Sequence, residues 1–228
     1  MTNIKNIHEI GRFKIEEYDG DTYVIRGLLN AEYCDRVREF IETSEDMEYN
    51  EYEETQNVVC YSKKFLDLEE SPERKKKLGD LQSRFKNIYI KAIVYLIDQI
   101  NSNIFIDTIP KHSGIILRKI TGKTRLHCDG THMEKGFIRN LSCVIGLNSD
   151  YESGRWSFPD YQTSMRIDKG DVLLFPPYWS HLHTVEKPLK GYRYTITFWF
   201  CESDSYRGYE ITNECSKYNL SHYQIKNK

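Results

Sequence analysis

Residues 123 to 132, with the sequence KTRLHCDGTH, gather two histidines, an aspartate and a cysteine in a short segment. His127 and Asp129 are two positions apart, so in an extended strand they share a face and Cys128 points to the opposite face. A neutral imidazole beside a carboxylate supplies two ligands of the two-histidine, one-carboxylate set that binds non-haem Fe(II). A hydrogen-bonded histidine–aspartate pair in a polar loop is the alternative. The iron interpretation therefore needs a second histidine from another strand.

That second histidine is available in the segment FPPYWSHLHTVEKPLKGYRYTITFWF, residues 175 to 200. The segment contains both His181 and His183, which share a face if the chain is extended. Strand alternation alone therefore does not choose between them.

Arg193 stands ten residues after His183, on a segment whose side chains alternate between polar and aromatic. One face carries Arg193, Thr195 and Thr197, and the other carries Tyr194, Ile196, Phe198 and Phe200. This alternation predicts a strand that lines a polar pocket on one side and packs on helices on the other. An arginine inside a pocket requires an anion, and the planar guanidinium fits a carboxylate bidentately.

The first half of the chain predicts the elements that support this pocket. The segment FKIEEYDGDTYVIRGLL predicts two strands around Asp19-Gly20-Asp21, and Asn30 predicts the N-cap of a helix. Residues 45 to 65 are polar and rich in tyrosine, which indicates a solvated loop with one strand at NVVCYS, or a flap that contacts the substrate. Ser71 and Pro72 predict the start of another helix. Its apolar stripe comprises Phe85, Ile88, Tyr89, Ala92, Ile93, Leu96, Ile97 and Ile100.

From about residue 113 the pattern changes to short strands punctuated by Gly, Asp, Asn and Pro, which is typical of a sandwich or jelly roll. We therefore expect an α+β fold with supporting N-terminal helices packed on one sheet. We expect a single domain over 1–228, with N-terminal strands and helices in 1–112, the β core in 113–201 and a tail in 202–228.

Composition narrows the class of protein. The 228 residues are 39% hydrophobic and 29% charged with a net charge of −2, which indicates a globular protein and gives no basic surplus for nucleic acid. No apolar run predicts a signal peptide or a membrane span, so we expect a cytoplasmic protein without a membrane partner. The six cysteines form no CxxC pair, which favours reduced thiols over disulfides and argues against a zinc site at Cys128. The sequence does not predict the oligomeric state.

Taken together, these segments resemble the prolyl 4-hydroxylase-like branch of the Fe(II)/2-oxoglutarate dioxygenases. The resemblance spans about residues 23 to 201 and rests on HCD, on HTVEKPLKGYR, and on LNSDYESGRWSFPD and KGDVLLFPP between them. The matching positions, in order, are Leu147-Asn148, Gly154, Phe158-Pro159, Gly170-Asp171 and Phe175-Pro176. The resemblance implies a double-stranded β-helix (jelly roll) core.

The resemblance also implies the roles of the site residues. His127, Asp129 and His183 would bind Fe(II), and Arg193 would hold the distal carboxylate of 2-oxoglutarate. No catalytic side chain is expected beyond the metal ligands. The implied cosubstrates are 2-oxoglutarate and O2, with ascorbate as a reductant, and the implied substrate is a prolyl residue in a peptide or protein. A carboxylate at position 129 favours hydroxylation over halogenation, because related halogenases lack it.

The chain departs from the family pattern at two places near the pocket. Arg118 replaces a tyrosine common in relatives, and we expect it to bind 2-oxoglutarate or a substrate carboxylate unless it points outward. Gly146 replaces an aromatic residue, which predicts a wider pocket. His181 is expected at the pocket edge, His132 in a solvated loop, and His8, His112 and His222 on the surface.

Three alternative functions stay open at this point. The first is hydroxylation of a free amino acid or another small molecule. The second is oxidative demethylation of nucleobases, which is disfavoured because RYTITFWF lacks the further arginine of those enzymes. The third is a catalytically silent β-helix that binds a metal or ligand as a sensor or scaffold.

Overall fold

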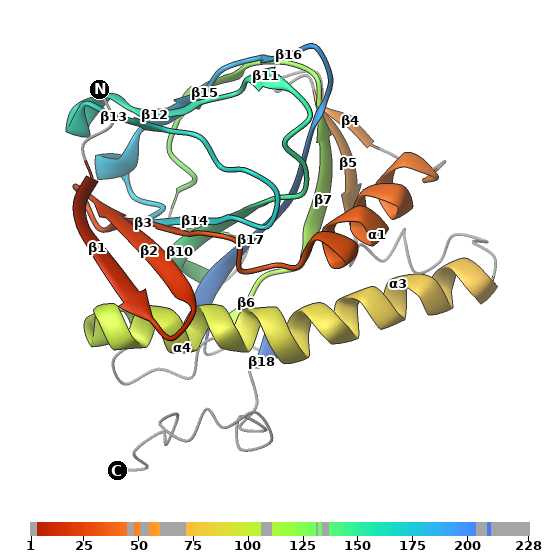
Figure 1. Cartoon of the computed structure of the whole chain (residues 1–228), viewed down its shortest axis with the longest axis horizontal. Coiled ribbons are helices and arrows are strands. Elements are labelled where there is room, and N and C mark those ends of the chain that lie inside the picture. Colours follow the sequence, from red (N-terminus) through yellow and green to blue (C-terminus); the bar gives the residue numbers. More distant parts are fainter. Residues whose placement is uncertain are drawn as a thin grey trace.

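The structure is a computed structural model, and it describes residues 4–44, 48–50, 55–59, 72–105, 111–130, 132–133, 137–203 and 209–210. Mostly antiparallel strands are combined with a few helices, as expected for an α+β fold (Figure 1). In this part of the chain, no helix combines the length and apolar character needed to cross a bilayer.

The N-terminal segment forms three antiparallel strands and a helix. The elements are β1 (Ile4–Ile10), β2 (Phe13–Tyr18), β3 (Thr22–Ile25) and α1 (Ala31–Glu42). The two strands expected around Asp19-Gly20-Asp21 are β2 and β3, and β1 was not predicted. The predicted N-cap is confirmed, because the Asn30 side chain accepts a hydrogen bond of 2.8 Å from the backbone N–H of Tyr33.

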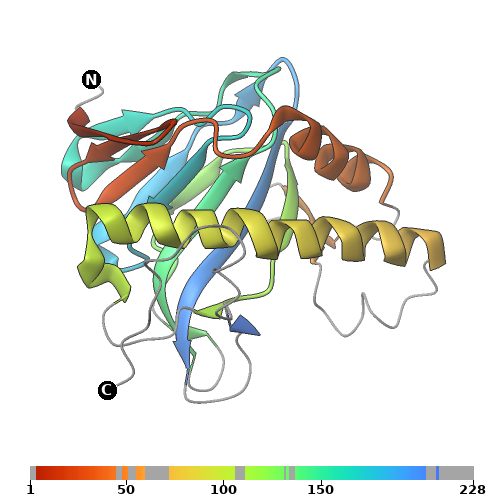
Figure 2. The same ribbon diagram turned by 60° about the horizontal axis from the view of Figure 1, so that its bottom comes forward.

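A second, longer helical segment crosses the outer face of the sheet (Figures 1 and 2). It comprises α3 (Pro72–Arg84), a π-helical turn η1 (Phe85–Ile90) and α4 (Lys91–Ile100), followed by the short η2 (Ser102–Phe105). Pro72 is its first helical residue, as predicted, and Ser71 lies outside the described residues. The wider π turn shifts the buried stripe. Ile88 is therefore 39% exposed instead of buried, while Ile90 and Val94 lie in the core.

Most strands belong to one large sheet with the order β1-β2-β3-β14-β10-β17-β7-β5-β4. The strands not yet introduced are β4 (Glu48–Asn50), β5 (Thr55–Val59), β6 (Lys111–His112), β7 (Ile116–Ile120), β9 (His132–Met133), β10 (Phe137–Gly146), β14 (Val172–Phe175), β17 (Arg193–Ser203) and β18 (Tyr209–Glu210). The strand predicted at NVVCYS coincides in part with β5, and its last three residues lie outside the described part. The N-terminal strands thus extend the sheet that contains the expected core.

A smaller sheet with the order β13-β12-β15-β8 faces the large one. Its strands are β8 (Thr124–His127), β12 (Trp156–Phe158), β13 (Thr163–Met165) and β15 (His183–Val185). A separate pair joins β11 (Glu152–Ser153) and β16 (Pro188–Leu189), and the short turns are η3 (Pro159–Tyr161) and η4 (Trp179–His181). Because the chain passes repeatedly between the two sheets, they form the predicted double-stranded β-helix.

Two apolar clusters hold these layers together. The first lies between the helices and the large sheet, where Phe40, Phe85 and Ile93 pack with Tyr194, Ile196, Phe198 and Phe200. The second fills one end of the β-helix and contains Tyr18, Val144, Trp156, Phe158, Phe175 and Val185. The predicted alternation along β17 is therefore confirmed, with its aromatic face under the helices.

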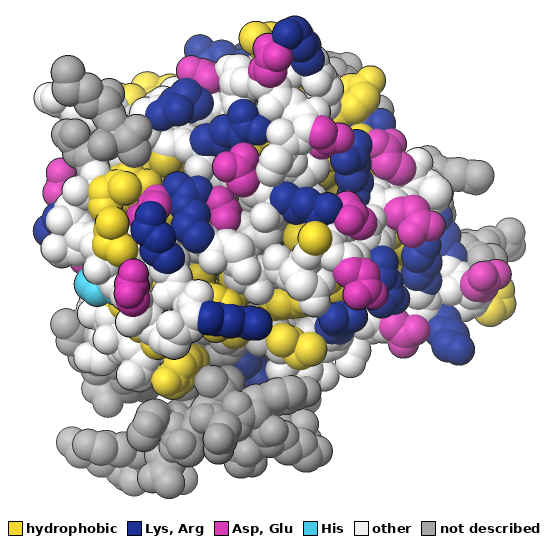
Figure 3. Space-filling model, viewed as in Figure 1, with side chains coloured by type: hydrophobic (Ala, Val, Ile, Leu, Met, Phe, Trp, Pro, Cys, Tyr) yellow, Lys and Arg dark blue, Asp and Glu magenta, His cyan; other side chains and the backbone are white. Residues whose placement is uncertain are grey.

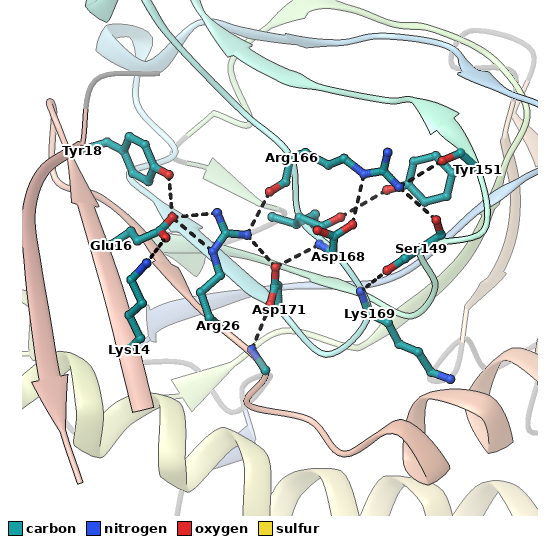
Figure 4. Close-up of polar contacts among 12 residues, drawn as sticks. Lys14, Glu16, Tyr18, Arg26, Ser149, Tyr151, Arg166, Asp168, Lys169 and Asp171 are labelled. Atoms are coloured by element: carbon teal, nitrogen blue, oxygen red, sulfur yellow. Dashed lines mark hydrogen bonds and ion pairs between the residues drawn. The ribbon is translucent and has the colours of Figure 1, made fainter. Parts of the chain in front are cut away.

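A polar network ties the N-terminal strands to the turn between β13 and β14 (Figure 4). Arg26 donates to Glu16 at 2.6 Å and to Asp171 at 2.6 Å, and Asp171 also accepts from the backbone of Gly27 at 2.8 Å. Burial tends to raise the pKa of Glu16, but hydrogen bonds from Arg26, Lys14 and Tyr18 outweigh it and lower the value to about 2. The paired carboxylates thus fix the N-terminal strands to the core.

The described cysteines are free thiols as expected, whereas one histidine expected at the surface is buried. Within the described part of the chain, Cys34, Cys128, Cys143 and Cys201 are free thiols, as expected. His8 lies 2.8 Å from Glu17 at the surface, whereas the expectation of a surface His112 is wrong. Pairing of β6 with β17 places His112 beneath Phe198, where it is fully buried, and burial lowers its pKa to about 4. His222 lies outside the described residues.

Candidate metal centre

Three predicted ligands, one from β8, one from the loop after it and one from β15, converge at one end of the β-helix. His127 pairs with His183 across the β8–β15 register, and Asp129 follows two residues after His127. The Asp129 Oδ1 lies 3.5 Å from the His127 Nε2 and 3.7 Å from the His183 Nε2. The potential ligand atoms all lie within 4.8 Å of one another, so this group could hold a metal ion.

Both imidazoles are oriented by their second nitrogen. The Nδ1 of His127 lies 2.8 Å from the carbonyl oxygen of Arg125, and the Nδ1 of His183 lies 3.0 Å from that of His181. Because a carbonyl only accepts, each Nδ1 carries the proton and each Nε2 presents its lone pair to the centre. Burial among Trp156 and other aromatic rings lowers the pKa of His183, which favours the neutral form that binds metals.

Two hydrogen bonds hold the carboxylate of Asp129 through Oδ2, while Oδ1 lies next to the imidazoles. Oδ2 accepts 2.5 Å from the Ser142 hydroxyl on β10 and 2.9 Å from the Trp199 Nε1 on β17. Burial tends to raise the pKa of Asp129, but the neighbouring imidazoles of His127 and His183 and these two donors hold it well below its usual range. Asp129 is therefore an anion whose Oδ1 is left facing the two imidazoles.

A cavity of about 220 Å³ opens beside these three residues. Its remaining lining comprises Arg118, Ile120, Thr124, Cys128, Arg139, Val144, Trp156, Phe175, Arg193, Thr195, Thr197 and Trp199. The polar face predicted for β17 thus forms one wall, and apolar residues of the inner cluster close the opposite side. A concave space that combines apolar walls with converging polar groups is typical of a small-ligand site.

Arg193 lies inside this cavity and is only 1% exposed. Its guanidinium centre is 5.7 Å from the Trp156 ring centroid, and its Nη1 donates to the Gly154 carbonyl at 3.4 Å. Nearby, Thr195 Oγ1 and Trp156 Nε1 are buried and have no hydrogen-bond partner within the described residues. Such groups are costly to bury alone, so this end of the cavity is suited to an anionic, hydrogen-bonding ligand.

Arg118 also lines the cavity, so the alternative of an outward-pointing side chain is wrong. It pairs with Thr195 across the β7–β17 register, whereas Arg193 pairs with Ile120. Along one strand, side chains two positions apart share a face, and directly paired residues on neighbouring strands also lie on the same face of the sheet. Arg118 and Arg193 consequently present two positive charges to the same space.

Three residues that hydrogen-bond to Asp129 were not singled out from the sequence, namely Arg139, Ser142 and Trp199. Trp199 continues the face of Thr195 and Thr197, so the alternation along β17 could have indicated it. The positions on β10 could not be derived by alternation, because the β10–β17 register shifts between Arg139 and Leu141. The Arg139 guanidinium lies 3.8 Å from the Trp199 ring centroid and donates to the Asp129 carbonyl.

Two expectations about the pocket edge are wrong. His181 does not line the cavity, because the 3-10 turn η4 interrupts the extended chain and directs its ring towards Tyr161 and the Gly20 carbonyl. Gly146 does not widen the cavity either. A Cβ at this position would lie 2.4 Å from the Asp168 carbonyl oxygen, so glycine permits a close backbone approach instead.

Two smaller expectations concern the residues around the HCD triplet. Cys128 was expected to point away from its neighbours, but the strand ends at His127 and Cys128 also contributes to the cavity wall. It is nevertheless not part of the potential metal-binding group. His132 lies in the short strand β9, which pairs with β10, instead of a loop.

Comparison with known proteins finds a family model that matches the part of the chain that contains this site. Residues 116–201 match the model of the 2OG-Fe(II) oxygenase superfamily, a range that includes all three converging ligands. No protein of curated function matches the chain significantly.

Several solved structures share its fold. A prolyl hydroxylase from Trichoplax adhaerens, in complex with a hypoxia inducible factor peptide fragment, is 17% identical with a TM-score of 0.55, covering 80% of this chain and 84% of its own. A Pseudomonas putida prolyl-4-hydroxylase is 13% identical with a TM-score of 0.54, covering 80% and 92%. A viral collagen prolyl hydroxylase from Paramecium Bursaria Chlorella virus-1 is 16% identical with a TM-score of 0.53, covering 80% and 96%. At these identities, the likeness establishes the fold.

Proposed function

We propose, on the premise that residues 116–201 belong to the 2OG-Fe(II) oxygenase superfamily, that this chain is a dioxygenase that hydroxylates a prolyl residue in a peptide or protein. The observation that carries the proposal is the convergence of two imidazole nitrogens and one carboxylate oxygen beside a cavity that contains a buried arginine.

The donor set fits Fe(II). Two neutral imidazoles and one carboxylate form the facial set of non-haem iron oxygenases, which leaves coordination positions open. His127, Asp129 and His183 would hold the metal, and the backbone carbonyls behind the two rings fix the nitrogen that each presents. When bound, Fe(II) with 2-oxoglutarate and O2 supplies the family's oxidising chemistry, which yields succinate, CO2 and a hydroxylated substrate.

The chain's own residues bind and orient the cosubstrate. Arg193 would pair with the distal carboxylate of 2-oxoglutarate, because a fully buried guanidinium needs an anion. Thr195 and Trp156 offer buried hydrogen-bonding atoms close by, which a carboxylate would satisfy. Trp156, Phe175 and Val144 contribute apolar walls that exclude water from the reacting atoms. Ascorbate would serve only to keep the iron reduced.

A polypeptide substrate is supported by exposed aromatic residues at the metal-binding end. The Pro177 carbonyl accepts a hydrogen bond of 2.9 Å from the backbone of Gly130, the residue after Asp129. The adjacent Tyr178 and Trp179 are 36% and 82% exposed. Large exposed aromatic side chains beside a catalytic cavity are suited to contact a bound chain.

The second candidate is hydroxylation of a free amino acid or other small molecule, and the cavity of about 220 Å³ is the observation that favours it. The non-catalytic alternative is disfavoured, because the site retains a complete ligand set together with Arg193. A scaffold protein would not need the ordered imidazoles and the buried arginine at once.

The test is incubation of the protein with Fe(II), 2-oxoglutarate and O2 together with a library of proline-containing peptides and the free amino acids. We expect a mass increase of one oxygen on a prolyl peptide, in equal amount with succinate, and none with His183→Ala. Hydroxylation of free amino acids alone would favour the second candidate. Iron and 2-oxoglutarate binding without any product from the whole panel would contradict the proposal.

A further inference from the structure

The first strand, β1, forms an edge of the large sheet. It stands at the end of the strand order, and within the described residues it pairs only with β2. Both ribbon views place β1 at an outer edge of the molecule, on the side away from α1 (Figures 1 and 2). A strand of seven residues without proline at such an edge offers backbone N–H and C=O groups to another strand.

Side-chain bonds to Glu17 on β2 hold β1 in its extended form. The Glu17 carboxylate accepts a hydrogen bond of 3.0 Å from the Asn6 amide, and it lies 2.8 Å from the His8 Nε2 and 3.0 Å from the Lys5 Nζ. The strand is therefore ordered on β2 before any further strand binds to it, which lowers the entropic cost of pairing.

The backbone groups of Ile7 and Glu9 point to the free edge. Ile10 pairs with Phe13 across a two-residue turn, and the pair that closes such a hairpin is hydrogen-bonded. Because hydrogen-bonded pairs alternate along an antiparallel ladder, Ile10 and His8 direct their N–H and C=O groups to β2. The residues between them direct theirs outward, where a second strand can pair with them.

The side chains of β1 place an exposed apolar residue between opposite charges. Ile4 and Ile7 are 40% and 53% exposed. Lys5 and Glu9 are also exposed, and each lies two positions from Ile7, on opposite sides of it. Hydrophobic side chains are visible at the edge of the molecule that β1 forms, next to basic and acidic ones (Figure 3).

The sequence of β1, IKNIHEI, complements itself when a second copy pairs with it antiparallel and centred on Ile7. Ile7 then faces Ile7 of the second copy. Lys5 faces Glu9 and Asn6 faces His8, and the two-fold symmetry repeats both of these pairs. Opposite charges and apolar side chains that face each other across an antiparallel pair stabilise it.

The other symmetric registers lack this match. Centring the pair on Lys5 or on Glu9 would place like charges opposite each other, which destabilises a strand pair. Centring it on Asn6 or on His8 would place a charged side chain opposite an isoleucine. The charges on β1 therefore oppose indiscriminate pairing of the edge and favour one register. The Lys5 ammonium has three donors, so it can bind Glu17 and the Glu9 of a second copy together.

We propose that a second copy of this chain binds at β1, so that two large sheets join into one continuous sheet across a two-fold axis at Ile7. Both copies use the same surface, so the contact closes as a dimer and leaves no free β1 edge for further copies. The described residues that line the metal-binding cavity lie outside β1, β2 and β3. The interface therefore leaves the described walls of the cavity unchanged.

The test is the molecular mass of the purified full chain in solution, measured by analytical ultracentrifugation from nanomolar to high micromolar concentration. The variants are Glu9→Lys and Lys5→Glu, alone and as an equimolar mixture. The matched control is Glu152→Lys, which makes the same charge change at an exposed residue of β11, a strand outside the large sheet.

We expect the wild type and Glu152→Lys to reach twice the mass of one chain as the concentration rises. Glu9→Lys and Lys5→Glu should each raise the dissociation constant of the dimer at least about tenfold, because like charges then face each other at two symmetric positions. Their mixture should dimerise again, since the lysines of one variant then face the glutamates of the other. Mixing would not reverse a simple loss of β1 structure.

A wild type with the mass of a single chain at every concentration would overturn the inference. A dimer that both β1 variants leave unchanged would also overturn it, because the contact would then lie elsewhere. A mixture of the two variants that stays monomeric would contradict the proposed pairing of Lys5 with Glu9.

Discussion

Replacing Trp199 with phenylalanine should weaken metal binding while leaving the cavity wall in place. Trp199 Nε1 donates to the outer oxygen of Asp129 at 2.9 Å, and its ring lies against Arg139 at 3.8 Å. Phenylalanine keeps an aromatic ring and removes the donor. A hydrogen bond to a charged group contributes about 1.5–3 kcal/mol, and loss of a partner behind a metal ligand typically costs about 10–100-fold in affinity.

We expect a loss near the lower limit, about tenfold or 1.4 kcal/mol, because Ser142 still donates to the same oxygen at 2.5 Å. The double variant Trp199→Phe with Ser142→Ala should lose more than either single variant, since no donor then fixes the carboxylate. The measurement is anaerobic competition for Fe(II) with a chromophoric chelator.

The matched control is Trp179→Phe, because Trp179 is 82% exposed and is not among the residues that line the cavity. It should bind Fe(II) like the wild type. An unchanged affinity in Trp199→Phe, or an equal loss in both variants, would refute the view that Trp199 orients the ligand.

Three further predictions concern the cosubstrate, acid stability and packing. Arg193→Gln should raise the KM for 2-oxoglutarate by about 10–100-fold, because a charge-assisted pair is lost; an unchanged KM in succinate assays would contradict this role. The pKa of Glu16 is lowered from 4.5 to about 2, so its stabilisation is complete above about pH 4.5 and is lost as the pH falls towards 2. Glu16→Gln should therefore lower the free energy of unfolding at pH 7 by up to about 3 kcal/mol. In denaturant titrations, the variant's free energy of unfolding should also fall less than that of the wild type between pH 4.5 and 2. An equally steep fall in variant and wild type would contradict the assignment. Gly146→Ala should lower the free energy of unfolding by about 1–3 kcal/mol, because the new Cβ meets the Asp168 carbonyl at 2.4 Å; thermal melting that matches the wild type would disprove the clash.

Much of the site could be predicted from the sequence because strands alternate regularly. Arg193, Thr195 and Thr197 lie in the cavity and their aromatic neighbours lie under the helices, as the period of two requires. Alternation does not choose between His181 and His183; the family resemblance indicates His183, which pairs with His127 although the β8–β15 register shifts between His183 and Val185.

The remainder depends on local irregularities that composition does not reveal. The register shift in β10 lets Arg139 line the cavity while Ser142 reaches Asp129, and the 3-10 turn before β15 removes His181 from the cavity. In the long helix, the π turn exposes Ile88, which an ideal helical period would bury. Gly146 differs again, because its role depends on a backbone segment distant in sequence.

The measurement that tests the central claim most directly is oxygen consumption and succinate release from 2-oxoglutarate by the iron-loaded chain, without added substrate. Asp129→Ala serves as the control, since it removes the one carboxylate of the metal-binding group. We predict slow, uncoupled formation of succinate by the wild type that requires Fe(II) and disappears in the variant. Failure of the wild type to bind Fe(II), or equal succinate formation by Asp129→Ala, would contradict the assignment of His127, Asp129 and His183 as the iron site.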